Sequence, residues 1–188
     1  MLKIITPFTL LLVLILNSCG TSSYYVLSPA QQPSTLYGYK NKIIGVEKVT
    51  VPDYLYKREI AVAKSSTQIS MLSGAEWGED LDAGLTHRLI SFIQKKFQQP
   101  SVYAYPWGLD RQPDLKLNVD VTRFIAQGNS VYLDANWEVV DMATKRRKTG
   151  LFHTKVITNN DADSIVSAMD KAFSEFTEVV AQGIKTYY

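Results

Sequence analysis

The first pattern along the chain is a single apolar run. Residues 4–16 are almost wholly apolar, with only two threonines and one proline among them, and Lys3 gives the start of the chain a positive charge. A helix that crosses a membrane needs roughly 20 apolar residues, and this run is clearly shorter. The pattern is typical of a signal peptide, so we expect residues 1–18 to direct export and then to be removed.

Further along, a strict alternation of apolar and polar residues predicts β-strands. It is clearest over residues 115–122 and 131–139, where every second side chain is apolar. Gln127-Gly128-Asn129 can turn the first stretch into the second, which predicts an antiparallel hairpin. Shorter stretches rich in β-branched or aromatic residues predict further strands over 24–27, 42–51, 60–64, 68–72, 102–105 and 151–157.

Two segments change to the period of an α-helix. Apolar side chains at 81, 85, 89, 92, 93 and 97 form one face of a helix that ends before Pro100. Asp80 can cap its start. A second apolar stripe runs from Ile165 to Gly183, after a cluster of capping residues at 159–161.

The order of these elements predicts an α+β fold. The strands carry one polar face each and the helices one apolar stripe, so we expect an antiparallel β-sheet with two amphipathic helices packed on one face. Residues 24–188 contain neither a repeat nor a linker, which indicates a single domain behind a short polar tether at 19–23.

The apolar run ends in Leu16-Asn17-Ser18-Cys19-Gly20, which resembles the lipobox of bacterial lipoproteins. In that motif the cysteine thiol takes a diacylglycerol, and after cleavage the cysteine becomes the N-terminus and is acylated again. Cys19 is the only cysteine of the chain, so it has no partner for an internal disulfide. At about 0.8 kcal/mol per buried methylene, three acyl chains far exceed the membrane binding of one myristoyl chain, so we expect a permanent anchor.

Composition and charge narrow the class of partner. The formal net charge is +2 and becomes +1 when Lys3 is removed (+2 − 1), so the protein lacks the strong field that steers nucleic acid. We therefore expect no nucleic-acid partner. Tyrosine is the commonest aromatic residue, with 11 Tyr against 7 Phe and 3 Trp, and this favours a contact surface.

Residues suited to catalysis or metal binding are few. The two histidines, His87 and His153, have no second histidine or cysteine at the spacing of metal ligands, and no Gly-x-Ser-x-Gly turn presents a nucleophile. The acidic pairs at 79–82 and 161–163 stand at helix starts, where capping and the helix dipole explain them. We therefore expect a protein that is not an enzyme and that uses no metal or cofactor.

The sharpest charge feature is the basic run formed by Lys145, Arg146, Arg147 and Lys148. It can be the solvated tip of a hairpin between two strands. It can also contact anionic lipid head groups or an acidic partner surface.

Five short strings follow the predicted lipobox. They are Ser23-Tyr24-Tyr25-Val26-Leu27-Ser28-Pro29, Val51-Pro52-Asp53-Tyr54-Leu55, Trp77 with Asp80-Leu81, Tyr105-Pro106-Trp107, and Val131-Tyr132-Leu133-Asp134-Ala135-Asn136-Trp137. Together they resemble the ABC-type transport auxiliary lipoproteins, the PqiC-like family, over nearly the whole mature chain. The basic run at 145–148 has no place in that pattern.

The resemblance implies an outer-membrane lipoprotein that faces the periplasm. Such a protein works with a tunnel-forming MCE-domain protein and its inner-membrane component to move lipids between membranes, and Gly20 agrees with sorting to the outer membrane. On this hypothesis the chain is a non-catalytic docking subunit, and aromatic or turn residues off the apolar stripes contact the partner. These candidates are Tyr24, Tyr25, Pro52, Asp53, Tyr54, Tyr105 and Trp107.

Two other hypotheses stay open. The domain can itself carry a lipid in a cavity between helices and sheet, or it can be a cell-envelope hydrolase, which the missing nucleophile motif disfavours. A ring-shaped tunnel protein would also be matched by a homo-oligomeric ring of this chain.

Overall fold

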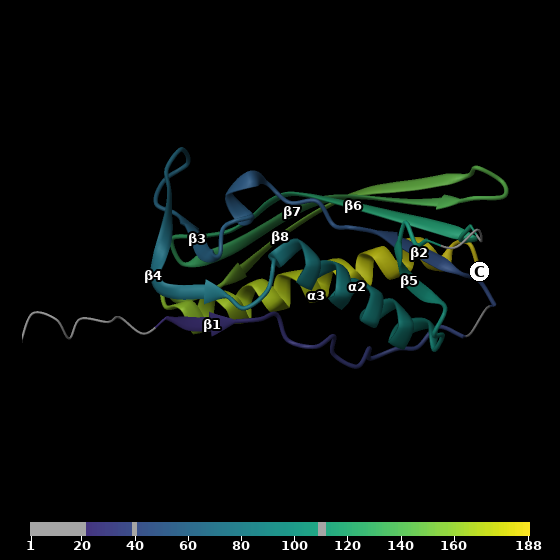
Figure 1. Ribbon diagram of the computed structural model, residues 1–188, viewed down its shortest axis with the longest axis horizontal. Helices are drawn as coiled ribbons and strands as arrows, with labels where there is room; N and C mark the ends of the chain where they lie inside the picture. Colours follow the sequence, from purple (N-terminus) through teal and green to yellow (C-terminus); the bar gives the residue numbers. More distant parts are fainter. Residues whose placement is uncertain (1–21, 39–40, 109–111) are drawn as a thin grey trace, which may run out of the picture.

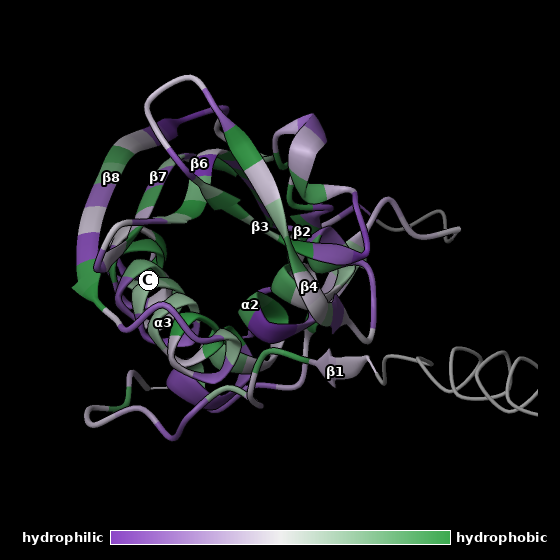
Figure 2. Ribbon diagram, turned by 90° about the vertical axis from the view of Figure 1, so that its left-hand side faces the viewer, coloured by the Kyte–Doolittle hydropathy of each residue, from purple (hydrophilic) through white to green (hydrophobic). Residues whose placement is uncertain are grey.

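The computed structural model describes residues 22–38, 41–108 and 112–188. The predicted signal peptide and Cys19 lie outside the described residues. Within them, a sheet of eight strands curves over two α-helices (Figures 1 and 2). The predicted α+β class is confirmed.

One side of the sheet is an antiparallel meander of three long strands. They are β6 (Leu115–Gln127), β7 (Ser130–Asp141) and β8 (Arg147–Ile157). The predicted hairpin is confirmed, since Val119 lies opposite Trp137 and Gln127 opposite Ser130. Alternation produces this register because a slip of one residue would turn every buried side chain to the solvent.

The other edge of β6 is shared by two short strands from one stretch of chain. β2 (Ile44–Glu47) pairs with the start of β6 and β3 (Glu59–Ala63) with its end, both in parallel. The single-turn 3₁₀ helix η2 (Asp53–Leu55) lies between them. The predicted strand over 42–51 is therefore shorter, although Thr50 still forms an isolated bridge to Asp120.

Three further strands extend the sheet beyond β2 and β3. β4 (Ile69–Trp77) is antiparallel to β3, whereas β1 (Ser23–Tyr25) pairs with β4 and β5 (Val102–Tyr105) pairs with β2 in parallel. The sheet is thus mixed rather than antiparallel throughout. Alternation reports which face of a strand is buried and carries no signal for its direction, so the parallel pairs could not be predicted from it.

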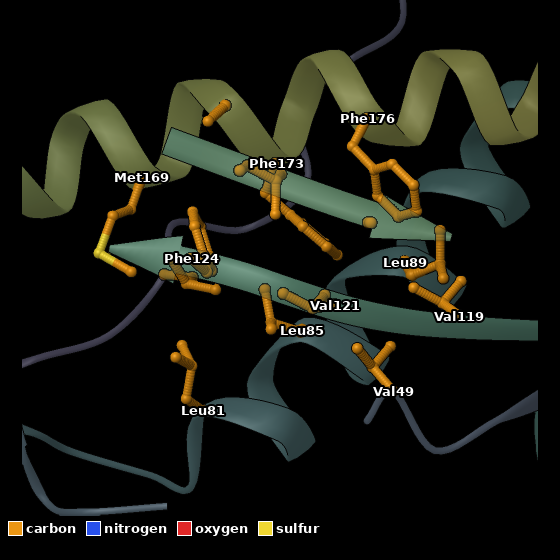
Figure 3. Close-up of a cluster of buried hydrophobic side chains, with 14 of the residues drawn as sticks. Val49, Leu81, Leu85, Leu89, Val119, Val121, Phe124, Met169, Phe173 and Phe176 are labelled. Carbon is orange, nitrogen blue, oxygen red and sulfur yellow. The ribbon is translucent and has the colours of Figure 1, made fainter. Parts of the chain in front are cut away.

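The two helices pack on one face of the sheet, as predicted. α2 (Leu81–Phe97) and α3 (Ala162–Lys185) lie side by side beneath the arch of strands (Figure 2). Leu85 and Leu89 of α2 meet Val121 and Phe173 in the cluster that Figure 3 shows, and all four are at most 1% exposed. Since burying one such side chain stabilises a fold by roughly 1.5–3 kcal/mol, this layer holds the helices to the sheet.

The helix starts differ in how they are capped. Asp161 accepts a hydrogen bond from the Ser164 amide at 2.8 Å, which caps α3. Asp80 occupies the N-cap position of α2, but its side chain makes no capping bond. Asp82 instead lies buried in the first turn, where it accepts from the Ala83 amide and pairs with Lys48 at 2.6 Å.

The segment after β1 has no helix or strand and packs against the helices as a strap. We call residues 27–38 the N-terminal strap; it runs beneath the helices on the side away from the sheet (Figure 1). Ser28 binds Asp170 of α3, and the Tyr37 amide donates to the Lys96 carbonyl of α2 at 2.7 Å. The helices are therefore held between the sheet and the strap.

The domain has two distinct ends, which α3 connects (Figure 1). At one end, which we call the β1 end, the Tyr25 hydroxyl bonds Asp163 in the first turn of α3. At the C-terminal end, the Tyr187 hydroxyl donates to the Val139 carbonyl at 3.2 Å. Since α3 has 24 residues, the two ends stand about 36 Å apart at about 1.5 Å per residue.

Candidate functional site

Three of the five strings singled out in the sequence meet at the β1 end. The Gly78 amide donates to the Tyr25 carbonyl at 2.7 Å, which joins the β1 string to the segment between Trp77 and Asp80. Leu55, from the string at 51–55, shares one cavity with Trp77 and Leu81. These three side chains are at most 4% exposed and form its apolar floor.

The cavity at the β1 end has a volume of about 300 Å³ and a charged rim. Lys57 and Arg58 line its rim together with Glu79 and Asp80, and the exposed Tyr56 lines it as well. The rim therefore offers cationic and anionic groups around an apolar base.

β1 presents its alternate side chains to opposite sides. Tyr24 is 64% exposed, and the Arg58 guanidinium lies 6.0 Å from the centre of its ring. Tyr25 faces the helices instead. The hydrogen bond from its hydroxyl to Asp163, together with burial, raises the pKa of Tyr25. Of these two partner candidates, only Tyr24 is widely accessible.

The candidates in η2 have different surroundings from one another. Tyr54 is half-buried, and its hydroxyl accepts a hydrogen bond from the Phe124 amide at 3.4 Å, where β6 has an irregular register with β7. Burial raises the pKa of Tyr54. Pro52 is partly buried and Asp53 is exposed. Tyr54 thus fills the gap between β2 and β3, a packing role that leaves Asp53 as the accessible residue of the three.

Tyr105 and Trp107 lie near the C-terminal end, away from the other candidates. Their rings meet edge to face with centres 5.2 Å apart, and Tyr103 contacts Trp107 in the same way at 6.0 Å. A Cβ at Gly45 would come within 3.1 Å of Trp107, so the absence of a side chain at this position lets the indole pack against the strand. Tyr103 was not among the candidates predicted from the sequence, although its spacing of two from Tyr105 in a strand places both on one face.

The basic run is divided between a turn and a strand at the C-terminal end. Lys145 and Arg146 lie in the turn, and Arg147 and Lys148 begin β8. The Arg146 guanidinium stacks 5.5 Å from the ring centre of Tyr187, and Arg147 pairs with Glu138 at 3.3 Å. All four basic residues are exposed.

The turn and the aromatic cluster belong to the same end of the molecule. The Met142 amide, at the start of the turn, donates to the Asp114 carbonyl at 2.8 Å. Pro113, the residue before Asp114, packs together with Trp107 over Gly45. The seven partner candidates are thus divided between two ends, with β1 and η2 on one side and Tyr105 and Trp107 on the other.

A buried ionic cluster, which was not predicted from the sequence, joins the strap to both helices. Arg88 is 5% exposed and pairs with Asp170, and it also donates to the Ser28 carbonyl at 2.8 Å and to Ser174 Oγ at 2.6 Å. Burial lowers the pKa of Arg88 to about 10, so the guanidinium is still charged at neutral pH. A second pair, Lys96 with Glu178 at 2.6 Å, lies farther along the strap.

The two histidines lie in separate elements, His87 in α2 and His153 in β8. His87 is exposed, and His153 contacts Asp134 on the outer face of the sheet. Across residues 22–38, 41–108 and 112–188, three or more potential metal ligands nowhere come together. In the same ranges, neither helix combines the length and the hydropathy that a membrane span requires.

Comparison with known proteins identifies the class of this chain. It is 25% identical over 165 residues to the intermembrane transport lipoprotein PqiC of Escherichia coli (strain K12), which covers 87% of this chain and 86% of the relative. The PqiC protein of Shigella flexneri gives the same values.

Solved structures share the fold. A crystal structure of an uncharacterized protein has a TM-score of 0.73 at 24% identity, with 87% of this chain and 99% of that chain covered. A protein from Xanthomonas campestris has a TM-score of 0.74 at 15% identity, with 87% and 94% covered. The family model of the ABC-type transport auxiliary lipoprotein component matches residues 25–181, most of the sequence. The chain therefore belongs to the family of ABC-type transport auxiliary lipoproteins.

Proposed function

We propose that this protein is a non-catalytic lipoprotein subunit of an intermembrane lipid transport system. Cys19 anchors it to the periplasmic face of the outer membrane, and the folded domain docks a tunnel-forming MCE-domain protein that is joined to an inner-membrane component. The observation that supports this arrangement best is the position of β1 at one end of the domain and of the aromatic cluster and basic turn at the other.

The tether length sets the orientation of the domain in this proposal. Cys19 and Ser23 are four residues apart, which is at most about 14 Å of extended chain. The β1 end would therefore stay beside the bilayer. The C-terminal end, about 36 Å farther along α3, would point into the periplasm, where the tunnel protein arrives.

The chemistry of the C-terminal end suits a protein partner. Tyr103, Tyr105 and Trp107 supply aromatic surface of the kind that is enriched at interfaces. The exposed basic turn beside them favours an acidic partner surface. Of the two functional hypotheses for the run at 145–148, this position favours partner contact over lipid head groups, because the turn would point away from the bilayer.

Co-purification with the MCE-domain protein tests the docking proposal. Reversing the charge of the turn with Lys145→Glu and Lys148→Glu should lower recovery of the partner at least tenfold, since like-charge contacts across an interface are strongly unfavourable. The matched control is Lys171→Glu together with Lys64→Glu, both exposed and outside the C-terminal end. Equal recovery with both double variants would exclude the turn from the interface.

The free edge of β8 supports a homo-oligomeric ring as part of this proposal. Among the described strands, β8 pairs with β7 alone, and its outward residues Leu151 and Ile157 are 85% and 78% exposed. A long edge strand with exposed apolar residues is a ready site for a second chain. Analytical ultracentrifugation of wild type and Leu151→Lys would show whether assembly depends on this edge.

A second candidate function is supported by a different cavity, which lies between the sheet and the start of α3. It has a volume of about 320 Å³, and its wall combines the apolar side chains of Val62, Leu72, Ala126 and Ile165 with polar residues such as Asn160. Such a cavity could hold part of an acyl chain, as a lipid carrier requires. Native mass spectrometry of a Cys19→Ser variant that shows no bound lipid would count against the carrier.

A further inference from the structure

The surface around β1 carries more exposed apolar and aromatic area than its role as a short edge strand requires. Tyr24, Val26 and Tyr56 are 64%, 57% and 53% exposed. Lys57 and Arg58 follow Tyr56 directly in the sequence and are exposed as well. We call these five residues the β1 patch.

The β1 patch is one continuous surface. Val26 and Tyr24 lie over Gly78, where a Cβ would come within 3.1 Å of Val26 and 3.9 Å of Tyr24. Gly78 lines the same cavity as Tyr56 and Arg58, and Arg58 reaches back to the ring of Tyr24. Residues from β1, from the chain after η2 and from the end of β4 therefore meet around a single opening.

The composition of the β1 patch fits the interface between lipid and water. Tyrosine is enriched there because its ring is apolar and its hydroxyl polar, and lysine or arginine beside it can reach lipid phosphates. A soluble surface of a monomer rarely groups exposed apolar side chains in this way without a partner. The first described residue, Ser22, is three positions from Cys19, so the bilayer is the nearest partner for this surface.

The rim charges of the cavity narrow the class of lipid. Lys57 and Arg58 can bind a phosphate, while Glu79 and Asp80 stand on the same rim and can bind an ammonium group. A purely anionic head group would be repelled by the two carboxylates. A zwitterionic head group presents both charges, and the floor of Leu55, Trp77 and Leu81 offers it an apolar base.

We propose that the β1 patch rests on the head-group layer of the membrane that holds the anchor, and that its cavity binds a zwitterionic phospholipid head group. The inference rests on the proposed function, because the anchor at Cys19 brings the patch to the bilayer. It adds a second, non-covalent contact that would hold the domain upright with its C-terminal end toward the periplasm.

Site-directed spin labelling of the lipidated full chain tests this contact. With Cys19 acylated, a cysteine introduced by Tyr56→Cys is the only thiol that takes a nitroxide label. In vesicles of phosphatidylethanolamine and phosphatidylglycerol, the label at position 56 should collide several-fold more with oxygen, relative to an aqueous nickel complex, than a label at Gln182→Cys. Gln182 is the matched control because it is also exposed but lies near the end of α3, away from the patch.

Vesicle flotation of the same samples distinguishes a missing lipid anchor from a missing contact of the β1 patch. A chain that does not float with vesicles has no lipid anchor, which overturns the proposed function. A chain that floats but gives equal collision ratios at positions 56 and 182 keeps the anchor and overturns the contact of the β1 patch.

Changes in the lipid composition and in the rim charge test which class of head group the cavity binds. Replacing phosphatidylethanolamine by phosphatidylglycerol alone should lower the collision ratio at position 56, and Lys57→Glu should lower it in the mixed vesicles. Lys171→Glu, on the exposed side of α3, should leave it unchanged. A ratio that is the same in both vesicle types and in both variants would overturn the zwitterionic site.

Discussion

Ser28 and Asp170 lie 142 residues apart in the sequence, and Ser28 Oγ donates to Asp170 Oδ2 at 2.7 Å. The same carboxylate neutralises Arg88, whose side chain is 4% exposed. The strap, α2 and α3 therefore share one buried charge cluster. Its position explains why a segment without regular secondary structure holds a defined path across two helices.

Asp170→Ala should destabilise the domain strongly. Removing one partner of a buried ion pair leaves the other charge uncompensated, which costs about 3–5 kcal/mol of the free energy of unfolding. Urea denaturation of a Cys19→Ser background would measure this loss. Lys171→Ala, one position along α3 and exposed, should change the free energy of unfolding by less than about 0.5 kcal/mol. A similar small change for both variants would show that the cluster is solvated rather than buried.

Gly183→Ala should also destabilise, against the usual preference of helices. An alanine inside a helix is normally favoured over glycine by roughly 0.5–1 kcal/mol. Here the added Cβ would come within 2.4 Å of the Trp137 ring, and overpacking of this kind costs about 1–3 kcal/mol. Thermal unfolding would show a lower Tm. Adding Trp137→Phe removes the part of the ring that clashes. The double variant should therefore lose less stability than the sum of the losses in the two single variants.

Tyr37→Ala should loosen one end of the strap without releasing the other. The Tyr37 ring meets Phe97 edge to face at 5.2 Å, and the ammonium groups of Lys96 and Lys185 lie 4.7 and 4.4 Å from its centre. Since an aromatic pair contributes about 0.5–1.5 kcal/mol, hydrogen exchange of the amide at 37 should speed up by about 2- to 10-fold.

The Ser28 amide is the internal reference for this experiment, because it is bound separately by Asp170 at 3.0 Å. Leu36→Ala, at an exposed neighbouring position, is the matched control. Loss of protection at both Ser28 and position 37 in Tyr37→Ala would show that the strap opens as one unit.

The stability of the domain should fall as the pH rises from about 10 to about 12, in part through Tyr188. Burial raises the pKa of Tyr188 to about 12, and the hydrogen bond from Gln99 opposes this only in part. The folded state thus favours the neutral phenol. The stabilisation that this raised pKa provides is fully present below about pH 10, the pKa of tyrosine in the unfolded chain. It is lost as the pH rises toward 12, where Tyr188 ionises in the folded state as well.

The slope of stability against pH gives the measurement. In chemical denaturation between pH 9 and pH 12, Tyr188→Phe should flatten the decline, whereas Tyr24→Phe, at a position that is 64% exposed, should keep the wild-type slope. Identical slopes in all three proteins would assign the decline to other groups.

Sequence patterns predicted the long elements of the fold well, because each has its own periodicity. The hairpin of β6 and β7 and the apolar stripes of both helices were predicted from alternate and helical spacing. The parallel pairing of β1, β2, β3 and β5 was not predicted, since neighbouring strands are chosen by tertiary packing and leave no local signal.

The functional surfaces were predicted only in part. Tyr24 and Trp107 were identified individually, but their separation by the length of α3 depends on the three-dimensional path of the chain. Arg88 and Asp170 could have been noticed, because each is a charged residue inside an otherwise apolar helical stripe. Such an interruption indicates a buried pair, although sequence does not tell which residues of the strap complete it.

The short strand β1 has a mechanical consequence. A force applied to the chain before Ser23 would act along the strand, while its hydrogen bonds to β4 lie across that direction. The ladder would be loaded in shear, so its bonds would resist together instead of breaking one at a time. The Arg88 cluster holds the strap that follows β1, so the same force would have to break this cluster next. Together the two attachments would make the N-terminal end of the domain resistant to tension.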